Sequence, residues 1–211
     1  MDKKKKIILI SIISVIIVLI ILGIAVIVIG NNKKEDTSKV INLYNTLKGK
    51  EEYSFFMKSN EDNEIYYAKK DGRAYIRTNY KGNIIENIIK DGNTYLLNKE
   101  DKCYYTYRNN EIDLNKIELN LKELDGVENT KGKEKIDGKN YEYEEYKKVI
   151  PLTMLDTTDN FEGYSMRFYF KEQDLKYIKT FKDDKKELLK IEILDNVDNK
   201  LFEIPSNFEE K

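Results

Sequence analysis

The sequence predicts an α+β protein: a strongly curved antiparallel sheet in the form of a half-open β-barrel, with two short helices, preceded by one N-terminal transmembrane helix. Three observations predict this class. An unbroken apolar run covers residues 7–29, most later segments alternate with the period of a strand, and two segments show apolar residues at helical spacing. The expected organisation is a basic cytoplasmic stub (1–6), a membrane span (7–29), a tether (30–35) and one extracytoplasmic domain (36–211).

The apolar run from Ile7 to Ile29 is long enough to cross a bilayer, which takes about 20 residues. Lysines 3–6 precede it, and basic flanks stay on the cytoplasmic side. A cleaved signal peptide is the alternative, but its apolar stretch is roughly 7–15 residues long and ends in a small-x-small site. Here bulky residues occupy 26–29. We therefore expect an uncleaved signal-anchor and a single-pass protein of the cell membrane, with its C-terminal domain outside the cytoplasm.

The composition excludes several classes of function. Histidine is absent, so His-based acid–base chemistry, Ser-His-Asp or Cys-His nucleophiles and His-ligated zinc are excluded. Acidic and basic residues are interleaved, and nucleic-acid binding would need clustered positive charge. Cys103 is the single cysteine and is expected to be a semi-buried structural thiol rather than a reactive one. We expect no metal and no cofactor. The bias toward Lys, Ile and Asn is typical of an AT-rich bacterial genome.

A first helix is predicted between residues 36 and 49. Asp36, Thr37 and Ser38 all suit an N-cap, and Gly49 suits the C-terminal end. After Gly49 the apolar period changes from near four to two, which indicates strands. The predicted strands are 53–57, 65–68, 74–77, 84–89, 95–97, 103–107, 141–146, 165–170, 175–181 and 188–194.

A short pattern, Asp-Gly-x-x-Tyr, recurs at 71–75, 91–95 and 137–141. Together with Lys81-Gly82, it places glycine where a two-residue hairpin turn needs positive φ. We interpret the pattern as a turn that begins a strand with a half-buried ring, not as a binding repeat. Tight turns cannot join parallel strands, so the pattern predicts an antiparallel meander.

Two apolar interruptions are expected to cover the concave side of the sheet. Leu114, Ile117, Leu121 and Leu124 recur at helical spacing, which predicts a second helix over 113–124. The loop 151–163 is also partly apolar. Because one large open sheet would expose an apolar face, these segments are the expected fillers. Phe55, Met57, Phe168 and Phe170 are then predicted to face inward, and Lys58, Arg167 and Lys171 to face water.

The last third of the chain resembles the LolA/LolB-like lipoprotein-carrier superfamily, in a membrane-anchored Gram-positive type related to germination and cell-envelope proteins. The resemblance is carried by 164–170, 175–179, 188–194 and the closing Phe202-Glu203-Ile204-Pro205. It implies an incomplete barrel whose apolar concave face holds acyl chains. The family's cavity arginine is not assigned by it: the candidates are Arg73, Arg77, Arg108 and Arg167.

The function expected from this resemblance is a membrane-tethered, non-enzymatic module that binds a lipid, an acylated protein or another apolar ligand. The alternative is a cell-envelope interaction factor that binds or regulates a cell-wall enzyme, for example in sporulation or germination. Aromatic and apolar residues on alternating strand positions are the pocket candidates, although the same alternation fits a filled core. They are Phe55, Met57, Tyr67, Met166, Phe168 and Phe170.

Carboxylate groups give weaker signals. Glu142, Glu144 and Glu145 could serve a glycosidase, but pairing with lysines across a sheet face explains them as well, and we expect no enzymatic activity. The acidic segments 156–160 and 195–199 lack the spacing of an EF-hand and are interpreted as turns.

Overall fold

The computed structural model describes residues 24–26, 38–59, 63–108, 121–147, 149–151, 164–182 and 185–211. These residues form two compact units. The described part of the first unit is 50–59, 63–108 and 193–211, and that of the second is 24–26, 38–49, 121–147, 149–151, 164–182 and 185–192.

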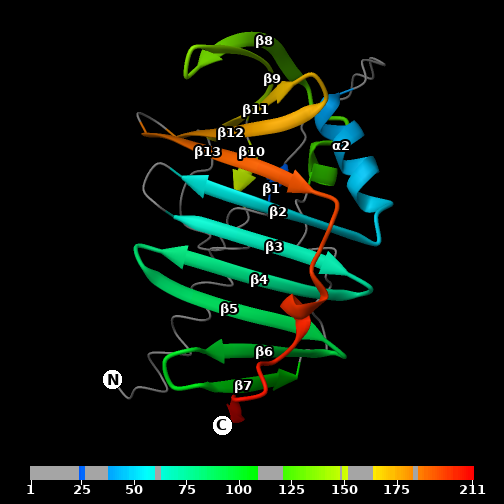
Figure 1. Ribbon diagram of the computed structural model, residues 1–211. Coiled ribbons are helices and arrows are strands. Elements are labelled where there is room, and N and C mark those ends of the chain that lie inside the picture. Colours follow the sequence, from blue (N-terminus) through cyan, green and yellow to red (C-terminus); the bar gives the residue numbers. More distant parts are fainter. Residues whose placement is uncertain are drawn as a thin grey trace. The chain divides into compact units, whose positions relative to one another are not determined.

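The first unit is an antiparallel meander in which each strand pairs with the next (Figure 1). A short strand near the C-terminus, β14 (Glu209–Glu210), pairs in parallel with Cys103 and Tyr104, the first two residues of β7. The meander strands are β2 (Glu52–Ser59), β3 (Glu64–Lys70), β4 (Arg73–Tyr80), β5 (Asn83–Lys90), β6 (Asn93–Asn98) and β7 (Cys103–Arg108).

The predicted hairpin turns are confirmed. Asp71 and Gly72 have φ of 50° and 70°, and Asp91 and Gly92 have 52° and 70°. Positive φ at both central residues defines the type I′ turn, whose twist matches that of the flanking strands. Lys81-Gly82 and Asp137-Gly138 adopt the same signs. Each turn joins two antiparallel neighbours, as the Asp-Gly-x-x-Tyr pattern predicts.

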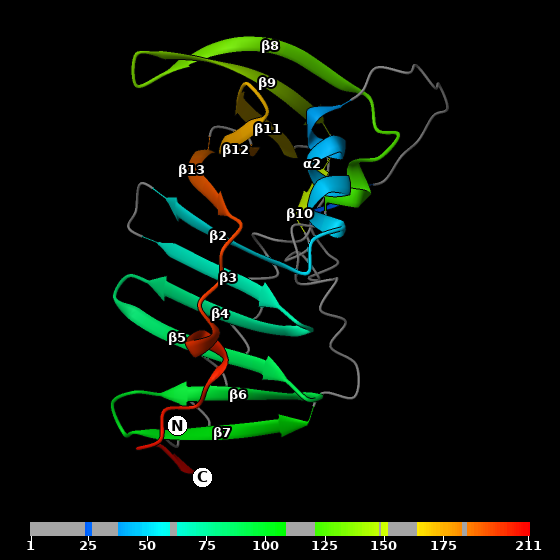
Figure 2. The ribbon, with the colours of Figure 1, turned by 45° about the vertical axis from the view of Figure 1, so that its right-hand side comes forward.

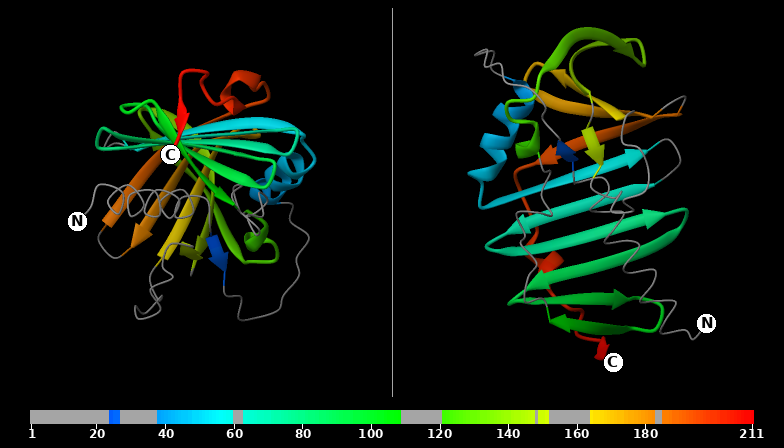
Figure 3. Two further views of the ribbon diagram at one scale, coloured as in Figure 1. Left: turned by 90° about the horizontal axis from the view of Figure 1, so that it is seen from below. Right: turned by 180° about the vertical axis from the view of Figure 1, so that it is seen from behind.

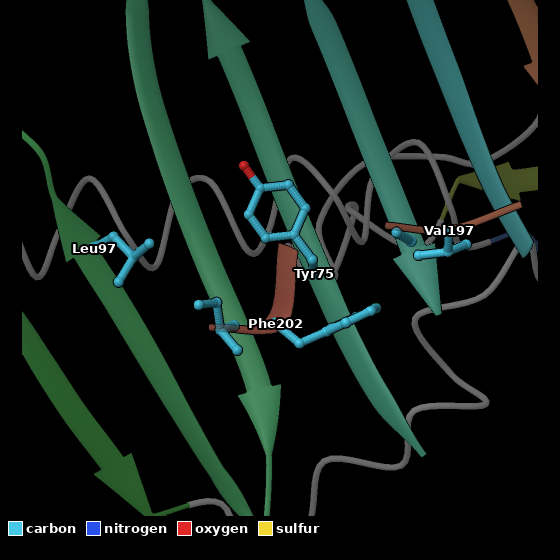
Figure 4. Packing of buried hydrophobic residues seen from close by; sticks show 6 residues of the cluster. Tyr75, Leu97, Val197 and Phe202 are labelled. Carbon is cyan, nitrogen blue, oxygen red and sulfur yellow. The ribbon is translucent and has the colours of Figure 1, made fainter. Parts of the chain in front are cut away.

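One face of the first sheet is covered by the segment after residue 194. This segment crosses the strands β2–β7 on one side (Figures 2 and 3) and contains the 3₁₀ helix η3 (Asn199–Phe202). Val197 and Phe202 pack over Tyr75 and Leu97 (Figure 4). The Arg73 guanidinium lies 4.7 Å from the centroid of the Phe202 ring. The covering segment therefore completes an apolar cluster that the meander alone would leave exposed.

The second unit contains the strand order β13-β12-β11-β9-β8, with every pair antiparallel. The register of β11 and β12 shifts between Tyr169 and Phe170, so that Lys176 of β12 has no partner residue in the pairing with β11. The strands are β8 (Asn129–Ile136), β9 (Lys139–Lys147), β11 (Tyr164–Lys171), β12 (Asp174–Lys182) and β13 (Lys185–Leu194).

Helix α2 (Lys39–Lys48) confirms the first predicted helix, in the second unit. Its N-cap is Ser38, whose hydroxyl accepts a hydrogen bond from the backbone N–H of Ile41, and it ends at Gly49. The 3₁₀ helix η2 (Leu121–Leu124) packs against α2 (Figure 2).

The predicted transmembrane helix is wrong, and with it the assignment to the cell membrane as a single-pass protein. Within the described residues, no helix is long and apolar enough to cross a membrane. Of the apolar run, 24–26 is described and forms strand β1 (Ile24–Val26), which pairs with β10 (Val149–Pro151). Ile and Val are strong strand formers, so apolar character alone did not specify a helix. The rest of the run, the stub and the tether lie outside the described residues.

The predicted fold class is also wrong. The described residues form a mostly antiparallel β structure with one α-helix, not an α+β half-open barrel with two helices. In the second predicted helix, 113–120 lies outside the described residues, and Leu121–Leu124 form a single 3₁₀ turn. A few apolar residues at helical spacing are weak evidence for an α-helix, because a short helix is marginal without packing. The loop 152–163 also lies outside the described residues.

Candidate functional site

A buried carboxylate caps helix α2 from a distant strand. Glu144 of β9 is 2% exposed and accepts hydrogen bonds from the backbone N–H of Lys39 (2.8 Å) and of Val40 (3.2 Å). It also accepts from the hydroxyls of Ser38 (2.7 Å) and Tyr146 (3.2 Å). The backbone N–H groups of Lys39 and Val40 are among those that a helix start leaves without intrahelical partners. A negative charge at this position is also stabilised by the helix dipole.

Two neighbouring groups respond to this arrangement. Burial raises the pKa of the Tyr146 hydroxyl, and the adjacent Glu144 carboxylate raises it further. The Lys39 ammonium donates to Glu142 over 2.7 Å and to the carbonyl of Glu172 over 2.6 Å. The hydrogen bond from Lys39 to Glu142, together with the charges of Lys39 and Lys133, holds the pKa of the Glu142 carboxyl below its usual range.

A hollow of about 330 Å³ opens beside this cap, and we call it the lysine hollow. Alternation along β8 and β9 puts Lys131 and Lys133 on the same face as Glu142 and Glu144, since the register pairs Lys131 with Glu144 and Lys133 with Glu142. Phe170 of β11 is the next neighbour of Glu142 on that face. The lining residues are Lys39, Lys131, Gly132, Lys133, Glu142, Tyr143, Glu144 and Phe170.

Each glutamate of the predicted carboxylate cluster has a basic partner. Glu142 pairs with Lys39 and Lys133, Glu144 has Lys131 at 3.9 Å, and Glu145 pairs with Arg167. The sequence left two explanations for these glutamates, catalysis or pairing with basic residues. The structure contains the basic partners.

Arg167 lies in a second charged cluster, on the opposite face of β11. Its guanidinium lies 4.5 Å from the ring centroid of Tyr143 and 5.0 Å from that of Phe181. It donates to Glu134 over 2.7 Å. Burial acts to raise the pKa of Glu134, but hydrogen bonds from Lys179, Tyr169 and Arg167 outweigh it and lower the pKa. Arg167 thus has two carboxylate partners, Glu134 and Glu145, and it does not line the lysine hollow.

The predicted ligand residues divide between the two units. In the first unit, Phe55, Met57 and Tyr67 are buried, and the rings of Phe55 and Tyr67 stack with centroids 5.0 Å apart. In the second unit, Met166, Phe168 and Phe170 share one face of β11 and are buried as well. Phe170 alone among the six lines the lysine hollow. Burial of this kind suits a filled core as well as a pocket wall, so the ligand role of all six stays a prediction.

The lysines of the hollow were not found from the sequence. The available signal was the pattern Lys-Gly-Lys at 131–133, opposite Glu142 and Glu144 in a hairpin whose turn, Asp137-Gly138, was recognised. Lys39 could not be placed, because it meets Glu142 across 103 residues of chain.

The chain matches no protein-family model and no curated protein. Among solved structures it is similar to lipoprotein LppX from Mycobacterium tuberculosis, with a TM-score of 0.49 and 13% identity over 76% of this chain and 95% of LppX. An uncharacterized conserved protein from Thermus thermophilus gives 0.46 and 7%, covering 82% and 96%. LprF from Mycobacterium bovis gives 0.46 and 14%, covering 80% and 95%. TM-scores below 0.5 assign no function, and none of the three is described as a germination protein.

Proposed function

We propose that this chain is a non-catalytic binding module for an anionic amphiphile, that is, a lipid, acyl group or similar apolar molecule that carries a carboxylate or phosphate. The observation that carries the proposal is the lysine hollow. Three ammonium groups and an aromatic ring line the same cavity, with the carboxylate of Glu144 already engaged by the helix start.

The charges of the hollow favour an anionic head group. The ammonium groups of Lys131 and Lys133 lie 3.9 and 3.6 Å from the carboxylates of Glu144 and Glu142, longer than a charge-assisted hydrogen bond of about 2.7–2.9 Å. Lys133 can therefore form a shorter contact with an incoming carboxylate or phosphate than the one it makes with Glu142. A phosphate or carboxylate held by two lysines is an ordinary arrangement for anion recognition.

The size and apolar lining of the hollow favour an amphiphile over an inorganic ion. Its volume of about 330 Å³ is at the small end of ligand pockets, which hold about 300–1,000 Å³. That space suits a head group with its first methylenes. Phe170 and the methylene stems of the lysines provide apolar contact for those methylenes.

A non-catalytic role is supported by the ion pairs of Glu142, Glu144 and Glu145, which leave the cluster saturated with hydrogen-bond donors. Histidine is absent from the chain. The neighbour LppX is described as a lipoprotein, and its similarity adds no weight here. No observation on the described residues favours the alternative role as a partner of a cell-wall enzyme.

The test is calorimetric titration of the chain with octyl phosphate and octanoate below their micellar concentrations, with octanol and inorganic phosphate as comparisons. Octyl phosphate and octanoate should each bind more tightly than either comparison, because both combine a negative charge with an alkyl chain. Lys131→Met and Lys133→Met should each weaken octyl phosphate binding roughly tenfold, since a hydrogen bond to a charged group contributes about 1.5–3 kcal/mol. Glu142→Gln should strengthen it by releasing Lys39 and Lys133.

Lys135→Met is the matched control, because Lys135 lies on the same strand and face but does not line the hollow. Its variant should bind octyl phosphate as the parent does. Equal binding of octanol and octyl phosphate, or losses of equal size in all three lysine variants, would overturn the proposal.

A further inference from the structure

A second hollow, of about 480 Å³, lies in the first unit at one end of strands β5 and β6, and we call it the edge notch. Its lining includes the first residues of β5 and the turn that follows β6. The lining residues are Arg77, Gly82, Asn83, Ile84, Ile85, Glu86, Leu96, Leu97, Asn98, Lys99 and Glu100.

The edge notch exists because β5 is longer than β6. The first residue of β5 with a partner on β6 is Glu86, opposite Leu97. Asn83, Ile84 and Ile85 extend beyond this register and pair with β4 on their other side only, as far as the described strands show. The chain after Asn98 turns away instead of continuing the ladder.

The parity of the hairpin determines which backbone groups point into the notch. The two residues that flank a type I′ turn exchange both hydrogen bonds, so Asn83 is directed at Tyr80 of β4. The next residue, Ile84, must then direct its N–H and C=O away from β4. Glu86, two residues further on, directs its backbone groups the same way and pairs with Leu97 of β6. No residue of β6 lies opposite Ile84 in this register. Ile84 thus presents one donor and one acceptor in the plane of the sheet.

An apolar and a charged side chain lie on the same face at this edge, because Ile84 and Glu86 are two positions apart on β5. Ile84 is 51% exposed. The buried carboxylate of Glu86 faces two cations, Lys99 at 2.7 Å and Arg77 at 3.7 Å. Lys99 is the more exposed of the two, with 64% of its side chain accessible, and Glu100 lies beside it in the turn. Because two cations share the Glu86 carboxylate, the exposed ammonium group of Lys99 can donate to a second carboxylate.

We propose that the edge notch binds an extended peptide segment of a partner protein, which adds as a short strand beside Ile84 and places an acidic side chain against Lys99. An open donor and acceptor on one strand residue are what another extended main chain satisfies, as in strand addition to a sheet edge. The peptide's apolar side chain contacts Ile84, and its carboxylate pairs with the exposed ammonium group of Lys99.

The test uses an acetylated and amidated hexapeptide, Thr-Val-Glu-Val-Thr-Val, titrated into the isotope-labelled chain and followed by amide chemical shifts. The expected shifts are at Ile84, Leu97 and Lys99. A peptide with Gln in place of Glu should bind roughly tenfold more weakly. Lys99→Met should produce the same loss for the Glu peptide and no further loss for the Gln peptide, because both changes remove one interaction.

Ile84→Pro removes the open N–H without breaking a bond to β4, since an edge position that faces away from its neighbour tolerates proline. It should abolish binding, whereas Ile84→Val should retain it. If Ile84→Pro alters the circular dichroism spectrum, the test rests on the comparison of Lys99→Met and the parent with the Glu and Gln peptides. Shifts absent at millimolar peptide, shifts centred on another strand, or a Gln peptide that binds as tightly as the Glu peptide would each overturn the proposal.

Discussion

At the scale of single residues, the same side-chain type takes different roles according to what the fold brings opposite it. Glu142 and Glu144 are two positions apart on one strand, yet one forms ion pairs at the surface and the other caps a helix from beneath. Ser38 could be predicted as an N-cap because its own backbone neighbours suffice for that role. Its partner Glu144 could not, because the two lie 106 residues apart and only the tertiary fold joins them.

Gly132 gives a prediction at this scale. A Cβ added to Gly132 would lie 2.5 Å from the Tyr143 ring, closer than atoms can approach, so the ring must move. Gly132→Ala should therefore lower the free energy of unfolding by about 1–3 kcal/mol, as overpacking does. Urea unfolding followed by circular dichroism measures this.

The matched control is Gly49→Ala, where an added Cβ meets nothing closer than 3.8 Å and φ is −81°. It should leave stability unchanged or raise it by up to about 1 kcal/mol, because alanine restricts the unfolded chain. Equal losses at both glycines would contradict the packing of Tyr143 on Gly132.

At the scale of elements, local chemistry predicted turns and strands well and helices poorly. The Asp-Gly turns need only two residues with positive φ, and strand alternation needs only neighbours. The membrane helix was inferred from a long apolar run, and the second helix from only four apolar residues at helical spacing. In the segment after residue 194, only a turn at 195–199 and the closing residues 202–205 were interpreted. The segment's apolar residues have no period, so their packing over β3–β6 could not be predicted.

Phe202 tests the role of that covering segment. It is buried against Ala68, Tyr75 and Ile88, and Arg73 stacks on its ring. Phe202→Ala should lower the free energy of unfolding by about 3–5 kcal/mol, the usual cost of deleting a buried phenylalanine.

Phe208→Ala is the comparison, since Phe208 is only partly buried at the edge of the same cluster. Its loss should be clearly smaller. If Phe202→Ala unfolds at the same midpoint as the parent, the segment contributes little to stability.

At the scale of the whole molecule, tyrosine dominates the aromatic content, with 16 tyrosines and no tryptophan. Burial raises the pKa of Tyr75, Tyr146 and Tyr169, and a nearby glutamate raises each further. The folded state therefore favours the neutral phenols. This contribution is fully present below the unfolded pKa of about 10 and is lost as pH rises above it.

The expected alkaline titration has two phases. Tyr75, Tyr146 and Tyr169 should ionise only in the later phase, at a higher pH than a free phenol and together with unfolding. Ultraviolet difference absorbance of tyrosinate, recorded beside circular dichroism, separates the phases. One phase that includes every tyrosine while the fold is intact would contradict the burial of these hydroxyls.

The covering segment also has a consequence for how the chain is made. Synthesis proceeds from the N-terminus, and all of the second unit's residues leave the ribosome before 193–211. The second unit can therefore close while the meander β2–β7 still displays Tyr75, Ile88 and Leu97 on an uncovered face. Until residues 193–211 have left the ribosome, the nascent protein carries an exposed aromatic surface, and such surfaces promote aggregation.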